Sequence, residues 1–214
     1  MNLILASKSP RRRELLQMLG LTPKILVPEV CEDGDRSAFT PEELVMGLAS
    51  RKARATADIL RLHGDIPADT VILAADTVVV CDGKILEKPT DKADAARMLR
   101  LLSGRAHEVF TGVAVVIGDP CENGSLSVDV QRTAVYFREL TDTMIASYVA
   151  SNAPMDKTNV PIWNTPSWHD FAGAYGIQTA FGAYAVKRID GDFYNVVGLP
   201  LRRVMEILHD YGMI

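Results

Sequence analysis

The stretch TVILAADTVVVCDGKILEKP, residues 70–89, decides the fold. Its first half is an almost unbroken apolar run rich in valine and isoleucine, which is typical of a strand buried on both faces. Asp82-Gly83 predicts a tight hairpin turn, and Pro89 ends the returning strand because proline has no N–H for the ladder. The stretch therefore predicts a central strand that is joined to an antiparallel neighbour.

Helices separate most of the remaining strands. A strand at 3–6 leads to a helix with Ser9 as N-cap and Pro10 at its first position, and Gly20 ends that helix. TPEE at 40–43 is a capping box that begins a long helix. The other strands are expected at 24–28, 107–117 and 126–138, with a second hairpin formed by 182–189 and 193–198 across Asp190-Gly191. The other helices are expected at 91–103, at 142–150 and after Pro200, where Leu201, Val204, Ile207 and Leu208 face inward. Strands that occur both in hairpins and between helices predict an α/β protein whose mixed β-sheet has flanking helices.

The composition limits the partners of the protein. The chain has 214 residues and a net charge of −4, so a general basic face for nucleic acid is excluded and any basic cluster is local. No apolar run approaches the ~20 residues of a membrane span, and no basic region precedes the first apolar stretch. The three cysteines Cys31, Cys81 and Cys121 are sparse and lie in no metal-ligand spacing. We expect a cytoplasmic protein with no nucleic-acid or membrane partner.

The segment SKSPRRR at 7–13 carries the first chemical signal. Its serine hydroxyls and arginine guanidiniums gather where a strand runs into a helix, and the free N–H groups of that helix terminus favour anions. Arginines in a first turn oppose the helix dipole, which is consistent with a phosphate that shares the site. The alternative is a solvated basic turn. The spacing is not that of a P-loop.

Two charged residues lie where apolar ones are expected. Lys52 falls on the same predicted helix stripe as Leu44 and Leu48. Its amine therefore faces a substrate, or its aliphatic stem lies along the core and the amine reaches the solvent. Asp76 lies inside the apolar strand, where a carboxylate is costly without a partner. It is either satisfied by backbone donors at a bulge, or it serves as a general base or magnesium ligand at the rim of a cleft.

Lys88 and Glu32 complete the candidate set. Pairing about Asp82-Gly83 predicts that Lys88 returns close to Asp76, and the alternative is an ordinary surface lysine. Glu32 lies in a polar loop and is either a solvated acid or a second magnesium carboxylate. The four histidines lie far apart and predict no zinc site.

These residues, in this order, resemble the Maf family over nearly the whole chain. The motifs that carry the resemblance are SxSPRR at 7–12, KA at 52–53, ADT at 75–77, LEKP at 86–89, LSG at 102–104, AGAYGIQ at 172–178 and NVVGLPL at 195–201. The resemblance implies a single domain, residues 1–214, with two lobes around a central cleft and a fold similar to inosine triphosphate pyrophosphatase. It also implies a nucleoside triphosphate pyrophosphatase that uses Mg²⁺ or Mn²⁺ and releases a nucleoside monophosphate and pyrophosphate.

The resemblance assigns roles to individual residues. Asp76 matches the family's proton acceptor, and Arg11, Thr77 and Gln178 match positions linked to the choice of base. The remaining polar cleft positions are matched by Ser7, Ser9, Arg12, Glu32, Lys52 and Lys88. GIQ at 176–178 is similar to the branch that acts on dTTP and UTP, and the amide of a glutamine suits the donor and acceptor edge of a pyrimidine.

One segment departs from the family pattern. Fourteen residues at 158–171 intervene before AGAYGIQ, and their Trp163 and Trp168 are expected to stack on a base, to contact a second subunit, or to pack within the loop itself. The family also implies a homodimer and a house-cleaning role that extends to modified pyrimidine nucleotides. Two other functions stay open: a non-catalytic nucleotide-binding regulator of cell division, and a pyrophosphatase for modified purine triphosphates.

Overall fold

A computed structural model describes residues 1–30, 38–64, 66–151 and 168–214. The strands are β1 (Asn2–Leu5), β2 (Lys24–Ile25), β3 (Thr70–Cys81), β4 (Lys84–Leu86), β5 (Ala106–Ile117), β6 (Ser125–Phe137) and β7 (Val186–Asp190). The helices are α1 (Pro10–Met18), α2 (Pro41–Arg61), α3 (Lys92–Leu102), α4 (Asp142–Ser151), α5 (Ala180–Ala185), α6 (Phe193–Val197) and α7 (Leu201–Asp210), with short 3₁₀ turns η2 (Trp168–Asp170) and η3 (Ala172–Ala174).

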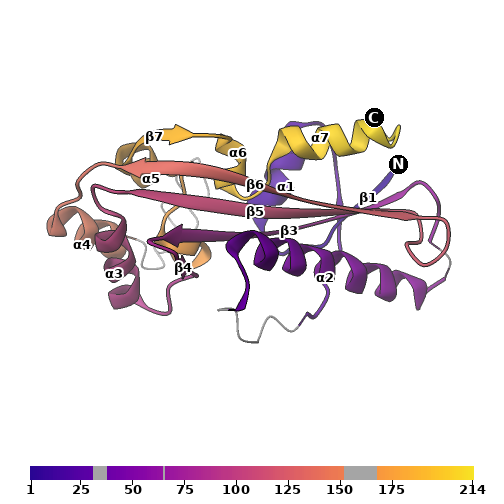
Figure 1. Cartoon of the computed structure of the whole chain (residues 1–214), viewed down its shortest axis with the longest axis horizontal. Coiled ribbons are helices and arrows are strands. Elements are labelled where there is room, and N and C mark those ends of the chain that lie inside the picture. The colour runs from indigo at the N-terminus through magenta and orange to yellow at the C-terminus, as the bar shows by residue number, and fades with distance from the viewer. Residues whose placement is uncertain (31–37, 65, 152–167) are drawn as a thin grey trace, which may run out of the picture. The chain divides into compact units, whose positions relative to one another are not determined.

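The strands form one mixed sheet, as the sequence predicts. Their order is β2-β1-β3-β5-β6-β7, and β4 pairs with β3 (Figure 1). β1 runs parallel to both β2 and β3, whereas the β3–β4 and β6–β7 pairs are antiparallel. The register Cys81↔Lys84 confirms the predicted hairpin at Asp82-Gly83.

The described residues form two compact units. The first contains residues 1–77, 110–131 and 193–214, and the second contains 78–109 and 132–192. The boundary falls within β3, so Asp76 and Thr77 belong to the first unit, whereas Lys88 and Gln178 belong to the second. The single domain and the central cleft implied by the family resemblance stay predictions.

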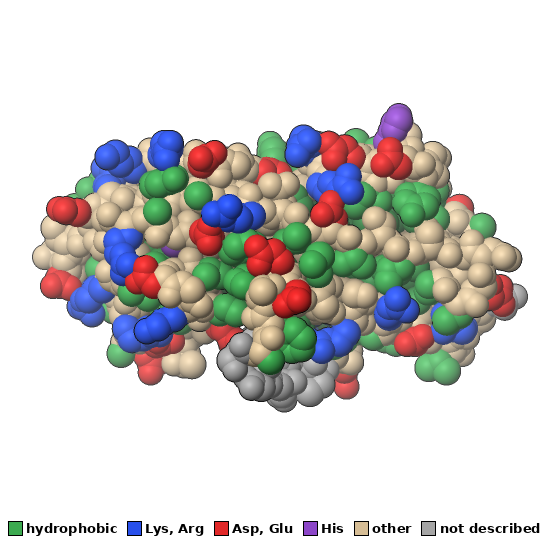
Figure 2. Space-filling view, viewed as in Figure 1, with side chains coloured by type: hydrophobic (Ala, Val, Ile, Leu, Met, Phe, Trp, Pro, Cys, Tyr) green, Lys and Arg blue, Asp and Glu red, His purple; other side chains and the backbone are tan. Residues whose placement is uncertain are grey.

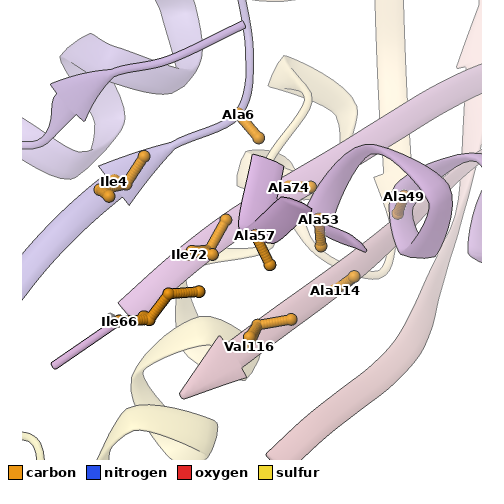
Figure 3. Packing of buried hydrophobic residues seen from close by; sticks show 10 residues of the cluster. All are labelled: Ile4, Ala6, Ala49, Ala53, Ala57, Ile66, Ile72, Ala74, Ala114 and Val116. Carbon is orange, nitrogen blue, oxygen red and sulfur yellow. The ribbon is translucent and has the colours of Figure 1, made fainter. Parts of the chain in front are cut away.

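Helix α2 covers one face of the sheet in the first unit, and α1 and α7 lie on the other face (Figure 1). The small side chains of Ala49, Ala53 and Ala57 allow α2 to approach the sheet closely, and they pack on residues of β1, β3 and β5 (Figure 3). The backbone of α2 comes very near β5 at Gly112, where a Cβ atom would lie 2.4 Å from the backbone of Val45. The strand therefore requires glycine at that point.

Local sequence signals place the starts of α1 and α2 correctly. Ser9 caps α1 with Pro10 at its first position, and Thr40 and Glu43 form the predicted capping box of α2. The buried face of α2 is rotated from the predicted stripe, because Ala53 and Thr56 are buried. Lys52 therefore lies at the margin of that face and not on its centre line.

The sequence predicts one C-terminal helix correctly, but it predicts the preceding hairpin and the extent of one N-terminal strand wrongly. α7 begins after Pro200 and buries Leu201, Val204, Ile207 and Leu208 as predicted. The predicted hairpin of 182–189 with 193–198 is wrong, because 193–197 is helix α6 and β7 pairs with β6 in the register Val135↔Ile189. Residues 180–185 are helical, and the predicted strand at 24–28 shortens to two residues. Valine-rich segments favour strands locally, but tertiary contacts decide their final state.

An aromatic cluster forms part of the core of the second unit. His107 is buried, its Nε2 lies 2.7 Å from the Tyr175 hydroxyl, and it contacts Phe137 edge to face. Burial lowers the pKa of His107 to about 3 and raises the pKa of Tyr175. Trp168 is also buried and donates from Nε1 to the Val149 carbonyl at 3.2 Å, so this part of the family-atypical insert packs against its own unit. Trp163 lies outside the described residues.

Charges of both signs are interspersed on the face of the molecule that Figure 2 shows. This agrees with the small net charge of the chain. Within the described ranges, the helices are all too short or too polar to cross a bilayer.

Candidate active site

The site lies where β1 turns into α1. The parallel ladder of β1 and β3 ends at Leu5↔Leu73, and one further bond joins the Ala6 N–H to the Leu73 carbonyl at 2.8 Å. The strand order β2-β1-β3 places the next strand of the chain on one side of β1 and the following strand on the other, both parallel to β1, so the carboxyl end of β1 is a switch point of the sheet. Ligands of open α/β sheets bind at such points. Asp76 and Thr77 lie just beyond Leu73 on β3.

Lys52 and Asp76 form an ion pair at this end of the sheet. The Lys52 Nζ atom lies 2.6 Å from Asp76 Oδ1, and the two side chains are only 17% and 15% exposed. The partner of the carboxylate is thus an ammonium group, and the alternative in which the Lys52 amine extends into solvent is wrong. The pair gives Asp76 the compensation that a half-buried carboxylate requires.

Asp76 and Thr77 point to opposite faces of the sheet. Ile72 and Ala74 belong to the core cluster under α2, and Asp76 continues this alternating row toward Lys52. Thr77 faces the other way and contacts Arg12 of α1. Adjacent positions of β3 therefore present a carboxylate on one face of the sheet and a hydroxyl on the other.

Arg12 joins three segments that are distant in the sequence. Its Nε donates to the Gly198 carbonyl at 2.8 Å, one terminal nitrogen to Ser7 Oγ at 3.0 Å and the other to Thr77 Oγ1 at 3.1 Å. A guanidinium has five N–H donors in a fixed planar arrangement, so only arginine can make these three bonds together. Arg12 thereby fixes the position of the strand-to-helix turn relative to β3 and to the segment after α6.

The hydrogen bonds continue from Thr77 into the core. Thr77 Oγ1 lies 2.9 Å from Thr111 Oγ1, and the Thr111 hydroxyl donates to the Asn195 carbonyl at 3.1 Å. Thr111 is fully buried on β5. Gly198, which closes the arrangement, has φ +122°, a conformation that favours glycine.

Sequence reasoning did not assign roles to Thr111, Asn195 or Gly198. Thr111 interrupts the apolar strand 107–117 in the same way that Asp76 interrupts 70–80, so the same signal was present. Asn195 and Gly198 lie in the NVVGLPL motif, which supported the family resemblance without a stated function for each residue.

The serine hydroxyls at the α1 terminus accept hydrogen bonds from within the turn itself. Ser7 is buried and its Oγ accepts from the Ser9 N–H at 3.2 Å, while the Ser9 hydroxyl accepts from the Arg12 N–H at 3.5 Å. The Nε and Nη1 atoms of Arg11 are buried, whereas Arg13 is exposed, as expected for a solvated residue that adds only positive field. The structure thus brings Ser7, Ser9, Arg12 and Thr77 into one connected group of hydrogen bonds.

Lys52 and Asp76 form a separate pair on the opposite face of β3, and the described contacts join further predicted site residues neither to that pair nor to this group. Lys88 and Gln178 are exposed residues of the second unit, and Glu32 lies outside the described residues. The β3–β4 register is described only as far as Val79↔Leu86, so the predicted approach of Lys88 to Asp76 stays a prediction.

Comparison with known proteins gives consistent matches. The family model for Maf-like proteins matches residues 2–211. The dTTP/UTP pyrophosphatase of Moorella thermoacetica is 46% identical over 211 residues, which cover 99% of this chain and 95% of that protein. The dTTP/UTP pyrophosphatase of Symbiobacterium thermophilum is 45% identical over 210 residues, which cover 98% and 94%. Among solved structures, a nucleoside-triphosphatase / dITP/XTP pyrophosphatase from Mycobacterium abscessus aligns with a TM-score of 0.39 and 16% identity over 65% of this chain and 76% of that one.

Proposed function

The chain belongs to the Maf family, and we propose that it is a nucleoside triphosphate pyrophosphatase that hydrolyses dTTP and UTP to the monophosphate and pyrophosphate. Its similarity to curated dTTP/UTP pyrophosphatases along nearly the whole length of each protein supports the choice of substrates. The GIQ segment at 176–178 agrees with that choice. Modified pyrimidine nucleotides are further candidate substrates in a house-cleaning role.

The observation that carries the proposal is the Lys52–Asp76 pair beyond the carboxyl end of the β1–β3 ladder. A protein that only binds nucleotides has no need for an acid embedded in an apolar strand, where it must be compensated by a second half-buried charge. A hydrolase needs such an acid next to the phosphates. The pair therefore favours the enzyme over a non-catalytic regulator of cell division.

The turn that precedes α1 binds the phosphates in this proposal. Backbone N–H groups at the helix terminus, the hydroxyls of Ser7 and Ser9 and the guanidinium of Arg11 form the positive end of the site. Arg12 holds this turn against Thr77 and Gly198 and adds its charge to the field. Two roles stay predictions from the sequence: phosphate binding by Lys88 and recognition of the base by Gln178.

The donor chemistry of the site fits a hard divalent cation. Mg²⁺ and Mn²⁺ take oxygen ligands, and Mg²⁺ is commonly held by one or two carboxylates together with substrate phosphates. Asp76 supplies one such carboxylate, and its bond to Lys52 uses only one of the two oxygens. Glu32 is the predicted second ligand. When bound, the cation neutralises charge on the phosphate oxygens.

The residues of the chain then account for the reaction. The Asp76 carboxylate orients a water molecule and accepts its proton while the water oxygen attacks the α-phosphorus. The bond from that phosphorus to the bridging oxygen breaks, and pyrophosphate leaves with the charge of that oxygen. Lys52 keeps the carboxylate in position through its 2.6 Å contact. The cations of the α1 turn offset the charge that develops on the leaving group.

A pyrophosphate-release assay tests this function. The purified protein is incubated with Mg²⁺ or Mn²⁺ and with dTTP, UTP, CTP, ATP, GTP and a modified purine triphosphate. Preference for dTTP and UTP, together with a 10²–10⁴-fold loss in Asp76→Asn, supports the proposal. Preference for the modified purine nucleotide supports the purine alternative instead. Nucleotide binding without release of pyrophosphate supports the regulator.

Metal concentration separates the two roles considered for Asp76. If Asp76 is the proton acceptor, Asp76→Asn loses turnover at every concentration of Mg²⁺. If it serves mainly as a metal ligand, high Mg²⁺ restores a large part of the activity. We also propose from the family resemblance that the protein works in the cytoplasm and that it forms a homodimer. Sedimentation of the purified chain would test the homodimer.

A further inference from the structure

Ala174, the last residue of η3, has a strained backbone conformation. We propose that Tyr148 is a positioning residue whose hydroxyl holds Ala174 in this conformation and thereby fixes the place of the LEKP segment, residues 86–89. The residues that carry the argument all belong to the second unit. The inference rests on the proposed function only in its consequence for turnover, because the LEKP segment includes Lys88, a predicted phosphate ligand.

The strain at Ala174 follows from its backbone angle. Its φ is +65°, in the left-handed region, where the Cβ of an L-residue lies too close to the following carbonyl oxygen. Among the described residues other than glycine, Asp82 alone shares a positive φ, and it lies in an Asp-Gly turn, where aspartate is well tolerated. Alanine has no polar group for a compensating local bond. Contacts from outside the turn must therefore hold Ala174 in place.

Tyr148 of α4 holds the strained residue directly. Its hydroxyl donates to the Ala174 carbonyl at 3.2 Å. Burial raises the pKa of Tyr148, so the hydroxyl keeps the proton that it donates. The ring stacks on Phe181 with the centroids 3.8 Å apart, which fixes the direction of the hydroxyl.

The residue before Ala174 connects the strained turn to the LEKP segment. The Gly173 N–H donates to the Glu87 carbonyl at 3.1 Å, and Lys88 is the next residue of the chain. Gly173 is also buried against β3, where a Cβ atom would lie 3.2 Å from the Val79 side chain. Because Gly173 and Ala174 share a peptide plane, relaxation of Ala174 would move Gly173 away from both neighbours.

The hydrogen bond and the strain are of similar size. One net hydrogen bond and one left-handed alanine each change an equilibrium constant by roughly tenfold. Loss of the Tyr148 hydroxyl should therefore raise the population of the relaxed turn by about tenfold. Glycine at position 174 has no Cβ and should lower that population by a similar factor.

Two substitutions and their combination test the inference. Tyr148→Phe keeps the stacked ring and removes only the hydroxyl. Ala174→Gly removes the Cβ that causes the strain. Tyr184→Phe is the matched tyrosine control, since Tyr184 is exposed on α5. Ala146→Gly is the matched glycine control, because Ala146 is an exposed residue inside α4, the helix that carries Tyr148.

Hydrogen exchange of the Gly173 amide, measured by NMR without nucleotide, reports the opening of the turn. We expect Tyr148→Phe to speed this exchange by about tenfold, Ala174→Gly to slow it by about tenfold, and the double variant to lie within about threefold of the wild type. Ala174→Gly should raise the urea midpoint, whereas Ala146→Gly should lower it because glycine weakens an ordinary helix. Tyr184→Phe should change neither measurement.

Pyrophosphate release from UTP tests the positioning role under conditions in which circular dichroism shows every variant to be folded. The value of kcat/KM should fall by about three- to tenfold in Tyr148→Phe and should recover in the double variant with Ala174→Gly. Tyr184→Phe should keep the wild-type value. A tyrosine that only adds stability would not have its loss corrected by a glycine at this one position.

Each outcome has a defined meaning. The inference is overturned by a lower urea midpoint in Ala174→Gly, by unchanged Gly173 exchange in Tyr148→Phe, or by turnover that is unaffected in Tyr148→Phe or not recovered in the double variant. If Tyr148→Phe is unfolded, the sign of the midpoint shift in Ala174→Gly decides. The expected exchange and midpoints in a protein that releases no pyrophosphate refute the proposed function but not the role of Tyr148 in the fold. Turnover of UTP with unchanged exchange does the reverse.

Discussion

Replacing Lys52 by methionine removes the positive partner of Asp76 and keeps the aliphatic stem that packs at the margin of α2. Replacing Asp76 by asparagine removes the negative partner and keeps the shape. Each single variant leaves one half-buried charge without its counterion, whereas the double variant leaves none. The three variants together separate the contribution of the pair to stability from its contribution to catalysis.

The expected magnitude follows from the burial of the pair. Breaking a fully buried pair costs about 3–5 kcal/mol, and breaking an exposed one costs about 0–1 kcal/mol. With 17% and 15% of the side chains exposed and a contact of 2.6 Å, the pair lies nearer the buried limit. We expect each single variant to lose about 2–3 kcal/mol of unfolding free energy. The double variant should recover to within about 1 kcal/mol of the wild type, because it removes both desolvated charges.

Urea unfolding without nucleotide measures these energies, and pyrophosphate release from UTP measures activity. Turnover should fall by about 10²–10⁴-fold in both variants that lack the Asp76 carboxylate, even where stability recovers. The pair Arg202 and Glu206, which is 74% and 41% exposed, is the control, and its disruption should change the unfolding free energy by less than about 1 kcal/mol. Additive losses in the double variant, or full turnover in Asp76→Asn, would refute the reasoning.

Three further predictions concern single residues. Arg12→Lys should lose about 2 kcal/mol of unfolding free energy, since one ammonium cannot make three bonds in a plane, and a wild-type urea midpoint would contradict this. His107 is held neutral in the fold, with a pKa near 3 against 6.5 for the unfolded chain, so its contribution is complete above pH 6.5 and is lost progressively as the pH falls toward 3. Stability should therefore drop by about 2 kcal/mol between pH 7 and 5, and His107→Phe should flatten that part of the pH profile; an equal slope in both proteins would exclude His107 as the cause. Gly112→Ala should destabilise the protein by at least about 1–3 kcal/mol because its Cβ would overlap the backbone of α2, whereas Gly47→Ala, on the open surface of that helix, should stabilise it by about 0.5–1 kcal/mol; thermal unfolding of the two variants provides the comparison.

Signals that act over a few residues were readable from the sequence. The cap at Ser9, the capping box at Thr40 and the turn at Asp82-Gly83 each depend on neighbours within four positions, and all three are present in the structure. The apolar strand at 70–80 and the order of strands and helices were sufficient for the mixed α/β class. Asp76 was identifiable as a candidate because a carboxylate in an apolar strand is costly wherever the strand lies.

Only the tertiary structure decided which partners these residues take. The sequence placed Lys52 on the inward stripe, but the contact with Asp76 depends on the rotation of α2 over the sheet. Arg12 bonds the carbonyl of Gly198, 186 positions away, and residues 193–197 form a helix where their valines favoured a strand. Caps and turns are fixed by the chain's own neighbouring atoms, whereas these contacts exist only after distant segments have packed together, so no local pattern encodes them.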